Sequence, residues 1–394
     1  MRLFKRSSRT SVQDLNPKPL PNIPDDLIEQ ILLKLPVKSL LRFKCVSKSW
    51  FSLISSKQFI QNHLNLSSND LIFGAGYPFQ FELKRTALQS ALLFNARFLE
   101  ATDINCPMKK NIVSPRIIGS SNGLVCIGVD PEDLHLWNPS TGKFKKLPDP
   151  NFRSEYFSSS SLFWFGYDKV NEDYKVVGIR DSDRNPFNKL IDMLHNQKSN
   201  FTEFKLYSRK TDSWKSIEDY KYDNGPLPQQ CAFLHGKLHF IVDNYINREE
   251  DYLPKLVHKI VSFDLANETF GEVGQPDPNF HDRSLGVLGG CLSFLNNPES
   301  KNDGMDVWMM MEYGVIESWT KVCFIPFAYN PGRFIVCAPV FLSKNGEILL
   351  KFDQYLVLFN PKIGSRRYFQ IPLRFGEITV DMYVESLVSP DDFP

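Results

Sequence analysis

The chain has 394 residues, of which 42% are hydrophobic and 23% charged, a composition typical of a globular protein with a large core. Its formal net charge is +1, which argues against the strongly basic field that nucleic-acid binding favours. No apolar run approaches the ~20 residues that a membrane-spanning helix needs. We therefore expect neither a nucleic-acid nor a membrane partner. Seven scattered cysteines without a Cys-x-x-Cys pair favour reduced thiols and a cytoplasmic and/or nuclear location.

Residues 1–20 are predicted to form a flexible basic tail. They include Arg2, Lys5, Arg6 and Arg9 but lack the apolar core of a secretory signal. A nuclear or organellar address is the alternative interpretation of these charges.

The stretch from Pro24 to Ile54 predicts short helices. Two acidic residues follow Pro24, which is typical of a first helical turn, and Pro36 ends the helix that they begin. A second helix is expected to begin after Val37, at Lys38 or Ser39, and a third is expected from Phe51 to Leu64. The apolar stripes of these helices are wider than so small a bundle needs for its own core. They predict burial either against a partner protein or against the domain that follows.

The order of residues in this stretch resembles the F-box, the helical module that docks on the Skp adaptor of a cullin-based ubiquitin ligase. The resemblance covers residues 21–65 and departs from the usual pattern at Ile23, where leucine is more common. It implies a small three-helix domain whose adaptor-binding residues are Pro24, Leu27, Ile31, Leu32, Leu35, Pro36, Leu40, Val46, Trp50 and Ile54.

From about Asn69 onward, short alternating runs separated by Gly, Asn, Asp and Pro predict β-sheet. One unit recurs, an apolar strand that carries an aromatic residue, a polar turn and a second strand with another aromatic residue. The leading aromatic residues are Trp137, Tyr207, Phe263, Trp308 and Phe359. Spacings of about fifty residues are typical of a four-stranded kelch-type propeller blade. Five such blades are predicted, with a sixth built from residues 71–116 and 378–388; an irregular pair of β-sandwiches is the alternative.

The hairpin spacing also predicts which aromatic side chains face each other. A four-residue loop would place three aromatic pairs directly opposite across neighbouring strands: Trp137 with Phe144, Tyr207 with Trp214, and Phe263 with Phe270. Two further pairs, which need longer turns, are expected in the last two units: Trp308 with Trp319, and Phe359 with Tyr368.

The segments GSSNGLVCI, LWNPSTGKFKKLP and SFDLANETF resemble the F-box-associated domain of plant F-box proteins, over residues 70–390. The residue order of three segments, ALLFNARF, GSSNGLVCI and DMYVESLV, is most similar to that of the S-locus F-box group. The overall fold class expected is thus α+β and multidomain, an F-box followed by a large all-β propeller of about six blades.

The resemblance implies the substrate-recognition subunit of an SCF (Skp, cullin and F-box) ubiquitin ligase, without catalytic residues or cofactors of its own. The expected partners are a Skp-family adaptor, cullin through that adaptor, and a protein substrate. Two alternatives remain, a pollen factor that recognises a secreted ribonuclease in self-incompatibility and a Skp-binding scaffold that does not cause degradation.

Two motifs imitate catalytic or metal sites. Gly119 to Gly123 matches Gly-x-Ser-x-Gly, but a strand follows it instead of the helix that a nucleophile elbow requires. His235 and His239 have a helical metal-ligand spacing within a segment that alternates as a strand. No catalytic, cofactor-binding or metal-binding residue is therefore predicted. The polar stretches 181–200 and 244–252 are interpreted either as spacers or as loops that contact a substrate.

Overall fold

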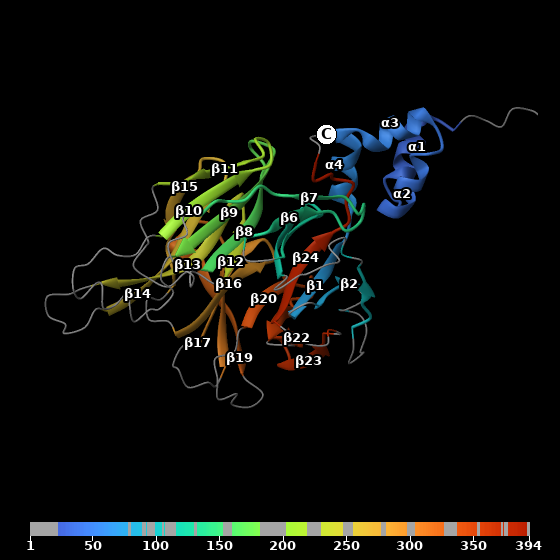
Figure 1. Cartoon of the computed structure of the whole chain (residues 1–394). Helices are drawn as coiled ribbons and strands as arrows, with labels where there is room; N and C mark the ends of the chain where they lie inside the picture. The colour runs from blue at the N-terminus through green and yellow to red at the C-terminus, as the bar shows by residue number, and fades with distance from the viewer. Residues whose placement is uncertain are drawn as a thin grey trace, which may run out of the picture.

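The computed structural model contains a small group of helices followed by a ring of β-sheets (Figure 1). It describes residues 23–77, 80–88, 92, 99–104, 106, 116–129, 132–152, 160–181, 202–218, 230–246, 255–276, 281–297, 304–326, 337–352, 355–371, 373 and 377–391. The predicted basic tail, 1–20, lies outside the described residues.

The N-terminal part has helices α1 (Asp25–Leu32), α2 (Val37–Phe43), α3 (Lys48–Ser55) and α4 (Lys57–Leu66). The first two follow a proline N-cap, Pro24 and Pro36 respectively, because proline cannot donate an intrahelical hydrogen bond but suits the start of a helix. The second helix thus begins at Val37, directly after its proline.

The expected single helix from Phe51 to Leu64 is wrong, because the chain breaks at Ser56. This residue has an extended backbone, φ −70° and ψ 144°, and its Oγ accepts a hydrogen bond from the backbone N–H of Phe59 at 3.2 Å. Ser56 is the N-cap of α4, so two helices replace one. A serine in an otherwise apolar helical pattern is a capping signal.

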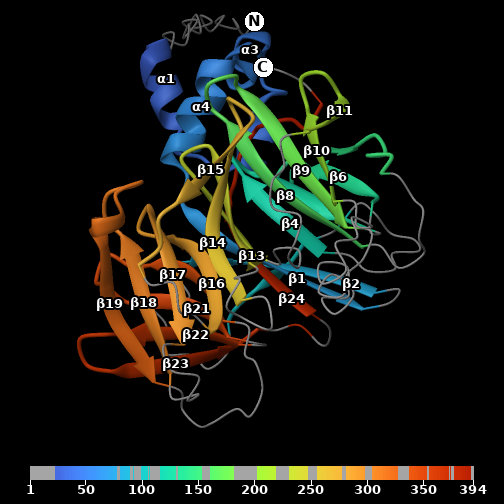
Figure 2. The ribbon, with the colours of Figure 1, turned by 90° about the vertical axis from the view of Figure 1, so that its left-hand side faces the viewer.

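Within the described residues, twenty-four strands form six antiparallel four-stranded sheets, the blades of a propeller (Figures 1 and 2). Their bounds, blade by blade, are: blade 1, β24 (Glu377–Val384), β1 (Asn69–Tyr77), β2 (Gln80–Ala87), β3 (Thr102–Asp103); blade 2, β4 (Arg116–Ser121), β5 (Leu124–Gly128), β6 (Leu134–Trp137), β7 (Phe144–Lys146); blade 3, β8 (Ser160–Asp168), β9 (Asp173–Asp181), β10 (Thr202–Ser208), β11 (Ser213–Ser216); blade 4, β12 (Cys231–Leu234), β13 (Lys237–Ile246), β14 (Lys255–Asp264), β15 (Thr269–Val273); blade 5, β16 (His281–Leu288), β17 (Cys291–Asn297), β18 (Gly304–Met310), β19 (Trp319–Pro326); blade 6, β20 (Cys337–Leu342), β21 (Ile348–Phe352), β22 (Tyr355–Asn360), β23 (Ser365–Gln370).

The ring closes through blade 1, in which the last strand of the chain pairs with the first. Strand β24 runs antiparallel to β1, with Ile72 opposite Asp381 and Asp70 opposite Tyr383. The predicted closing blade from the two ends of the domain is therefore confirmed, and so is the count of six. Closure by terminal strands ties the ends of the propeller together.

Three of the five predicted aromatic pairs are confirmed by the strand register. Trp137 lies opposite Phe144, Tyr207 opposite Trp214 and Phe263 opposite Phe270. The ring centroids of the last two pairs are 5.4 Å and 4.9 Å apart, within the range of favourable aromatic contacts.

The two pairs predicted for longer turns are wrong. Trp308 lies opposite Lys321, because the hairpin turn places Trp319 opposite Met310, two residues further along the strand. Phe359 lies opposite Arg366, because its turn has the same four-residue length as the turn of blade 2. The residues that close each turn set the cross-strand partners, and the spacing of the aromatic residues alone does not reveal which residues close it.

Apolar side chains fill the spaces between neighbouring blades. Between blades 3 and 4, Trp164 stacks on Phe240 with centroids 5.6 Å apart, and Phe204 contacts Phe263 at 5.0 Å. Each fully buried apolar side chain of this kind stabilises the fold by about 1.5–3 kcal/mol. The abundance of phenylalanine in the sequence thus serves the blade interfaces.

The propeller has two different faces. In blades 2 to 6, the turns that join the first to the second strand and the third to the fourth strand lie on one face, here called the turn face. On it, the β8–β9 turn meets the β14–β15 turn, with Asn171 Nδ2 3.4 Å from Ala266 O. The opposite strand ends, such as Asp181 and Thr202, which pair with each other, lie on the far face. Of the two predicted loops, Asp181 is the last residue of β9 and residues 244–246 belong to β13, whereas 182–200 and 247–252 lie outside the described residues.

Candidate functional site

The helices α1 to α4 expose large apolar side chains to solvent. On α1, Leu27 and Ile31 are 48% and 55% exposed, and their four-residue spacing places them on one face of the helix. Val46, in the link between α2 and α3, is 60% exposed. Ile23 and Phe51 are also exposed. These five residues are called the exposed apolar set.

The structure separates the predicted adaptor-binding residues into three groups. Pro24, Leu27, Ile31, Pro36 and Val46 are exposed, and Leu35 and Trp50 are half-buried. Leu32, Leu40 and Ile54 are at most 1% exposed. The ten residues are therefore not one surface, because the last three form the inside of the helical module.

The buried group makes a compact core beneath the exposed set. Leu32, Leu40 and Ile54 pack with Val37 and Phe59, and none of these side chains is available to a partner without opening the module. Their role is to hold α1 and the α2–α3 link in place.

Half-buried Trp50 and Leu35 are fixed by specific contacts. The Trp50 ring meets Phe43 edge to face, with centroids 5.6 Å apart, and Leu35 O lies 2.8 Å from His63 Nε2. The N-cap Ser47 accepts the backbone N–H of Trp50 at 3.1 Å, which sets the start of α3. Both residues therefore sit between the core and the surface.

Phe51 and Ile23 belong to the exposed set but were not among the predicted docking residues. Phe51 has a cationic neighbour, since Lys44 Nζ lies 5.8 Å from its ring centroid. Burial, together with the charge of Lys143 on the propeller, lowers the pKa of Lys44. The sequence shows that Phe51 and Ile23 are apolar, but it does not show that they are exposed.

Charges around the exposed set are segregated. Asp25 and Asp26 begin α1, whereas exposed basic side chains are found from the end of α1 to the start of α3: Lys34, Lys38, Arg42 and Lys48.

A residue from the far end of the chain completes the core of the helices. Leu387, which follows β24, packs in the same cluster as Leu32, Leu40 and Ile54 and is 6% exposed. An ion pair between Lys57 on α4 and Glu172 in the β8–β9 turn, 2.5 Å, marks a second contact with the propeller. The helices therefore lie against the turn face, as Figures 1 and 2 show.

The two motifs that imitate functional sites have structural roles. Gly119 to Gly123 spans the end of β4 and a hairpin turn, where Asn122 and Gly123 both have positive φ. His239 Nε2 lies 2.7 Å from the Tyr313 hydroxyl, and the ring of His235 contacts Tyr313 edge to face at 5.2 Å. In the described part of the chain no three His, Cys, Asp or Glu side chains gather as metal ligands would.

None of the described helices is long and apolar enough to cross a membrane.

Both parts of the chain match known domain families. Residues 20–62 match the F-box domain, and residues 93–389 match the F-box associated beta propeller domain. The F-box/kelch-repeat protein At3g23880 of Arabidopsis thaliana is 28% identical, over 94% of this chain and 96% of its own length. The F-box protein CPR1 of Arabidopsis thaliana is 30% identical, over 93% of this chain and 88% of its own length. This chain belongs to the family of F-box proteins that carry an F-box associated β-propeller domain.

Proposed function

We propose that this chain is the substrate-recognition subunit of an SCF ubiquitin ligase. Its F-box docks on a Skp-family adaptor, which binds cullin, and its propeller holds a target protein. The observation that carries the proposal is the exposed apolar set on helices that stand on the turn face. The far face of the propeller is then left for the target.

The energetics of docking favour this arrangement. Burying an exposed apolar side chain contributes about 1.5–3 kcal/mol, so Leu27, Ile31, Val46 and Phe51 together offset much of the entropy lost on association.

The chain acts by proximity in this proposal. Holding a target lysine near the ubiquitin-loaded partner raises its effective concentration, and this needs no acid, base or nucleophile from the chain itself. The separation of the docking helices from the far face supplies the two binding surfaces that a bridging subunit needs.

Exchange of one exposed residue tests the docking surface. Ile31→Glu places a charge on an exposed position, so the fold should persist, whereas the affinity for a purified Skp adaptor should fall by more than about tenfold. Ile363→Glu is the matched control, because Ile363 is 74% exposed on blade 6. Unchanged adaptor binding by Ile31→Glu, measured by calorimetry, would contradict the proposed surface.

A narrower role in pollen self-incompatibility is a second candidate. The segment DMYVESLV, which forms the end of β24 and the residues after it, resembles the S-locus F-box group and favours a secreted ribonuclease as the target. Transcript measurement across tissues tests this role: restriction to pollen is expected, and uniform expression would oppose it.

A scaffold that binds the adaptor without causing degradation is the remaining alternative. A ubiquitylation assay with proteasome inhibition separates it from the ligase role, because only a ligase subunit leads to ubiquitin-bearing targets that accumulate. We place either activity in the cytosol and/or nucleus, because the seven cysteines are scattered and include no Cys-x-x-Cys pair.

A further inference from the structure

The segment after the last strand, residues 385–390, lies between the F-box and the propeller and is here called the strap. It contacts both parts. On the F-box side, Leu387 enters the core made by Leu32, Leu40 and Ile54. On the propeller side, Val388 packs in the cluster between blades 2 and 3, which Ile60 of α4 also joins.

A single buried asparagine anchors the strap to blade 2. The side-chain Nδ2 of Asn138, which is fully buried, donates to Val388 O at 2.6 Å and to Ser386 O at 3.0 Å. Its Oδ1 accepts the backbone N–H groups of Ser140 and Thr141 in the β6–β7 turn. One side chain therefore makes hydrogen bonds to backbone N–H groups of the turn and to backbone carbonyl groups of the strap. Both hydrogen bonds to the strap are shielded from water.

Further contacts hold the strap on both sides of Asn138. Arg209 of blade 3 donates to Ser389 O at 2.8 Å, and Lys143 Nζ lies 3.4 Å from Ser389 Oγ. Arg85 of blade 1 pairs with Glu385. Blades 1, 2 and 3 are thus all tied to the segment that completes the F-box core.

We infer that the strap is a positioning segment, which makes the F-box and the propeller one rigid unit and sets the direction in which the far face points. The inference rests on the proposed function, because a fixed direction matters when a target must be held at one place relative to a docked ligase. Its physical basis is that Leu387 cannot leave the F-box core without exposing it, while Asn138 cannot release the strap without leaving buried carbonyl groups unpaired.

Asn138→Asp separates the two roles of this side chain. Aspartate keeps the oxygen that accepts from the turn but replaces the donor with a second acceptor, which faces Ser386 O and Val388 O. Asn360→Asp is the matched control. Asn360 also precedes a proline at the end of the third strand of its blade, and its Oδ1 accepts from Lys362 N at 3.1 Å, but it lies in blade 6, away from the strap.

The distance between the two parts gives the direct readout. Spin labels on unnatural amino acids at Lys38 on α2 and Thr320 on β19, both exposed, report it by pulsed resonance in the full-length chain. We expect one narrow distribution for the wild type and for Asn360→Asp, and a broad one for Asn138→Asp. A narrow distribution for Asn138→Asp, or a broad one for the wild type or for both variants, overturns the inference.

Leu387→Ala tests the same segment from the F-box side without changing charge, and it serves if Asn138→Asp does not fold. It should broaden the distance distribution and speed hydrogen exchange of the α2 and α3 amides by about tenfold, as expected for a partly lost core contact. Unchanged exchange and an unchanged distance would overturn the inference.

Adaptor binding distinguishes the inference from the function on which it rests. Asn138→Asp leaves Leu27 and Ile31 exposed, so it should bind the Skp adaptor with wild-type affinity while the lysines modified by self-ubiquitylation change. If the wild-type chain does not bind the adaptor, the proposed function fails, and the distance measurement still decides the role of the strap. An unchanged pattern of modified lysines alongside a broad distance distribution counts against positioning.

Discussion

The Nε2 atom of His239 lies 2.7 Å from the hydroxyl of Tyr313, and its Nδ1 lies 3.2 Å from Ala232 O. The neutral ring with a proton on Nδ1 satisfies both contacts, since it donates to the carbonyl and accepts from the phenol. The pair joins blade 4 to blade 5 in a site where His239 is fully buried.

The contribution of His239 to the stability of the protein should be lost as the pH drops from about 6.5 toward 4. Burial lowers the pKa of His239 to about 4, whereas the unfolded chain takes up the same proton near pH 6.5. The contribution of neutral His239 to the free energy of unfolding is therefore fully present above pH 6.5. It is lost on acidification, by about 3 kcal/mol in total. Urea unfolding at a series of pH values measures it.

Replacing the ring isolates this contribution. His239→Asn removes the titrating group, so the free energy of unfolding of the wild type should fall relative to that of the variant between pH 6.5 and 4. A difference between the two free energies that stays constant with pH would contradict this role of His239.

Truncation of a core leucine and of an exposed leucine in the F-box should have different effects. Leu40 is fully buried, so Leu40→Ala should lower the free energy of unfolding by about 2–5 kcal/mol. Leu27 is 48% exposed, so Leu27→Ala should change stability by less than about 0.5 kcal/mol and weaken adaptor binding instead. Thermal melting and calorimetric titration of both variants check the contrast, and a stability loss of equal size would refute it.

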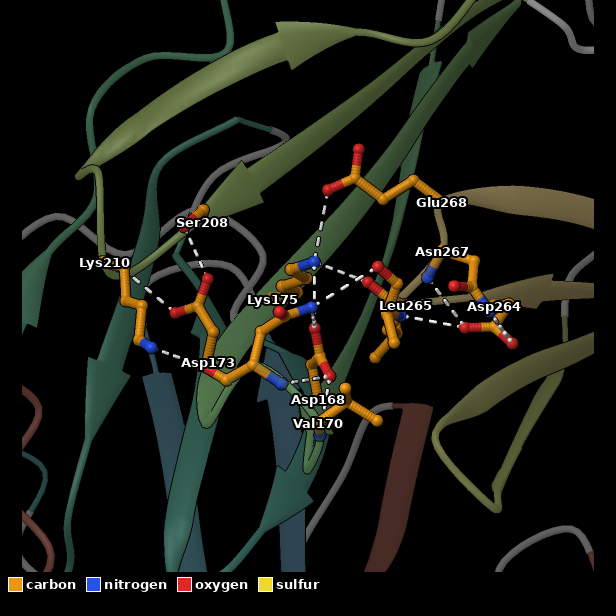
Figure 3. Close-up of polar contacts among 12 residues, drawn as sticks. Asp168, Val170, Asp173, Lys175, Ser208, Lys210, Asp264, Leu265, Asn267 and Glu268 are labelled. Atoms are coloured by element: carbon orange, nitrogen blue, oxygen red, sulfur yellow. Dashed lines mark hydrogen bonds and ion pairs between the residues drawn. The ribbon is translucent and has the colours of Figure 1, made fainter.

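Lys175 carries a buried charge that joins blades 3 and 4. Its Nζ lies 3.1 Å from Asp168 Oδ2 and 3.2 Å from Glu268 Oε1, and it donates to Leu265 O (Figure 3). Burial opposes the ionised form of Asp168, but the hydrogen bonds from Asn171 and Lys175 outweigh it and lower the pKa of that carboxyl.

Lys175→Met should therefore cost about 3–5 kcal/mol of stability, because it leaves the buried carboxylate without its cation. Adding Asp168→Asn should recover part of the loss, which a double-mutant cycle in urea measures. Lys57→Ala is the exposed comparison; it breaks the ion pair with Glu172 and should cost less than about 1 kcal/mol. Equal losses from Lys175→Met and Lys57→Ala would show that burial does not govern these pairs.

Two glycines with similar backbones should respond differently to alanine. Gly123 and Gly142 have φ of +80° and +74°, but a Cβ on Gly123 would lie 2.3 Å from Ser386 Oγ, whereas a Cβ on Gly142 would meet nothing within 4 Å. Both variants share the cost of a left-handed backbone. Gly123→Ala should lose about 1–3 kcal/mol more, because it displaces the strap. Calorimetric melting of the two variants measures the difference. Equal melting temperatures would contradict the close contact between position 123 and Ser386.

Much of this protein was determined by local sequence patterns. Prolines at 24 and 36 and the apolar spacing between them were enough to predict helices, because helix starts depend on neighbouring residues. The spacing of the repeated aromatic hairpins predicted five propeller blades, and the two ends of the domain were expected to form the closing blade. The break at Ser56 had a local signal too, in a serine able to cap the next helix.

Only the tertiary structure decided which apolar residues are inside. Leu32 and Ile31 are neighbours in one helical stripe, yet one is 1% and the other 55% exposed, because exposure depends on what packs against each side of a helix. The insertion of Leu387 into the F-box core likewise depends on a contact between distant segments. The sequence pattern carries the period of each element, whereas burial arises from the assembled neighbours, which here include a strap more than 300 residues away in the chain.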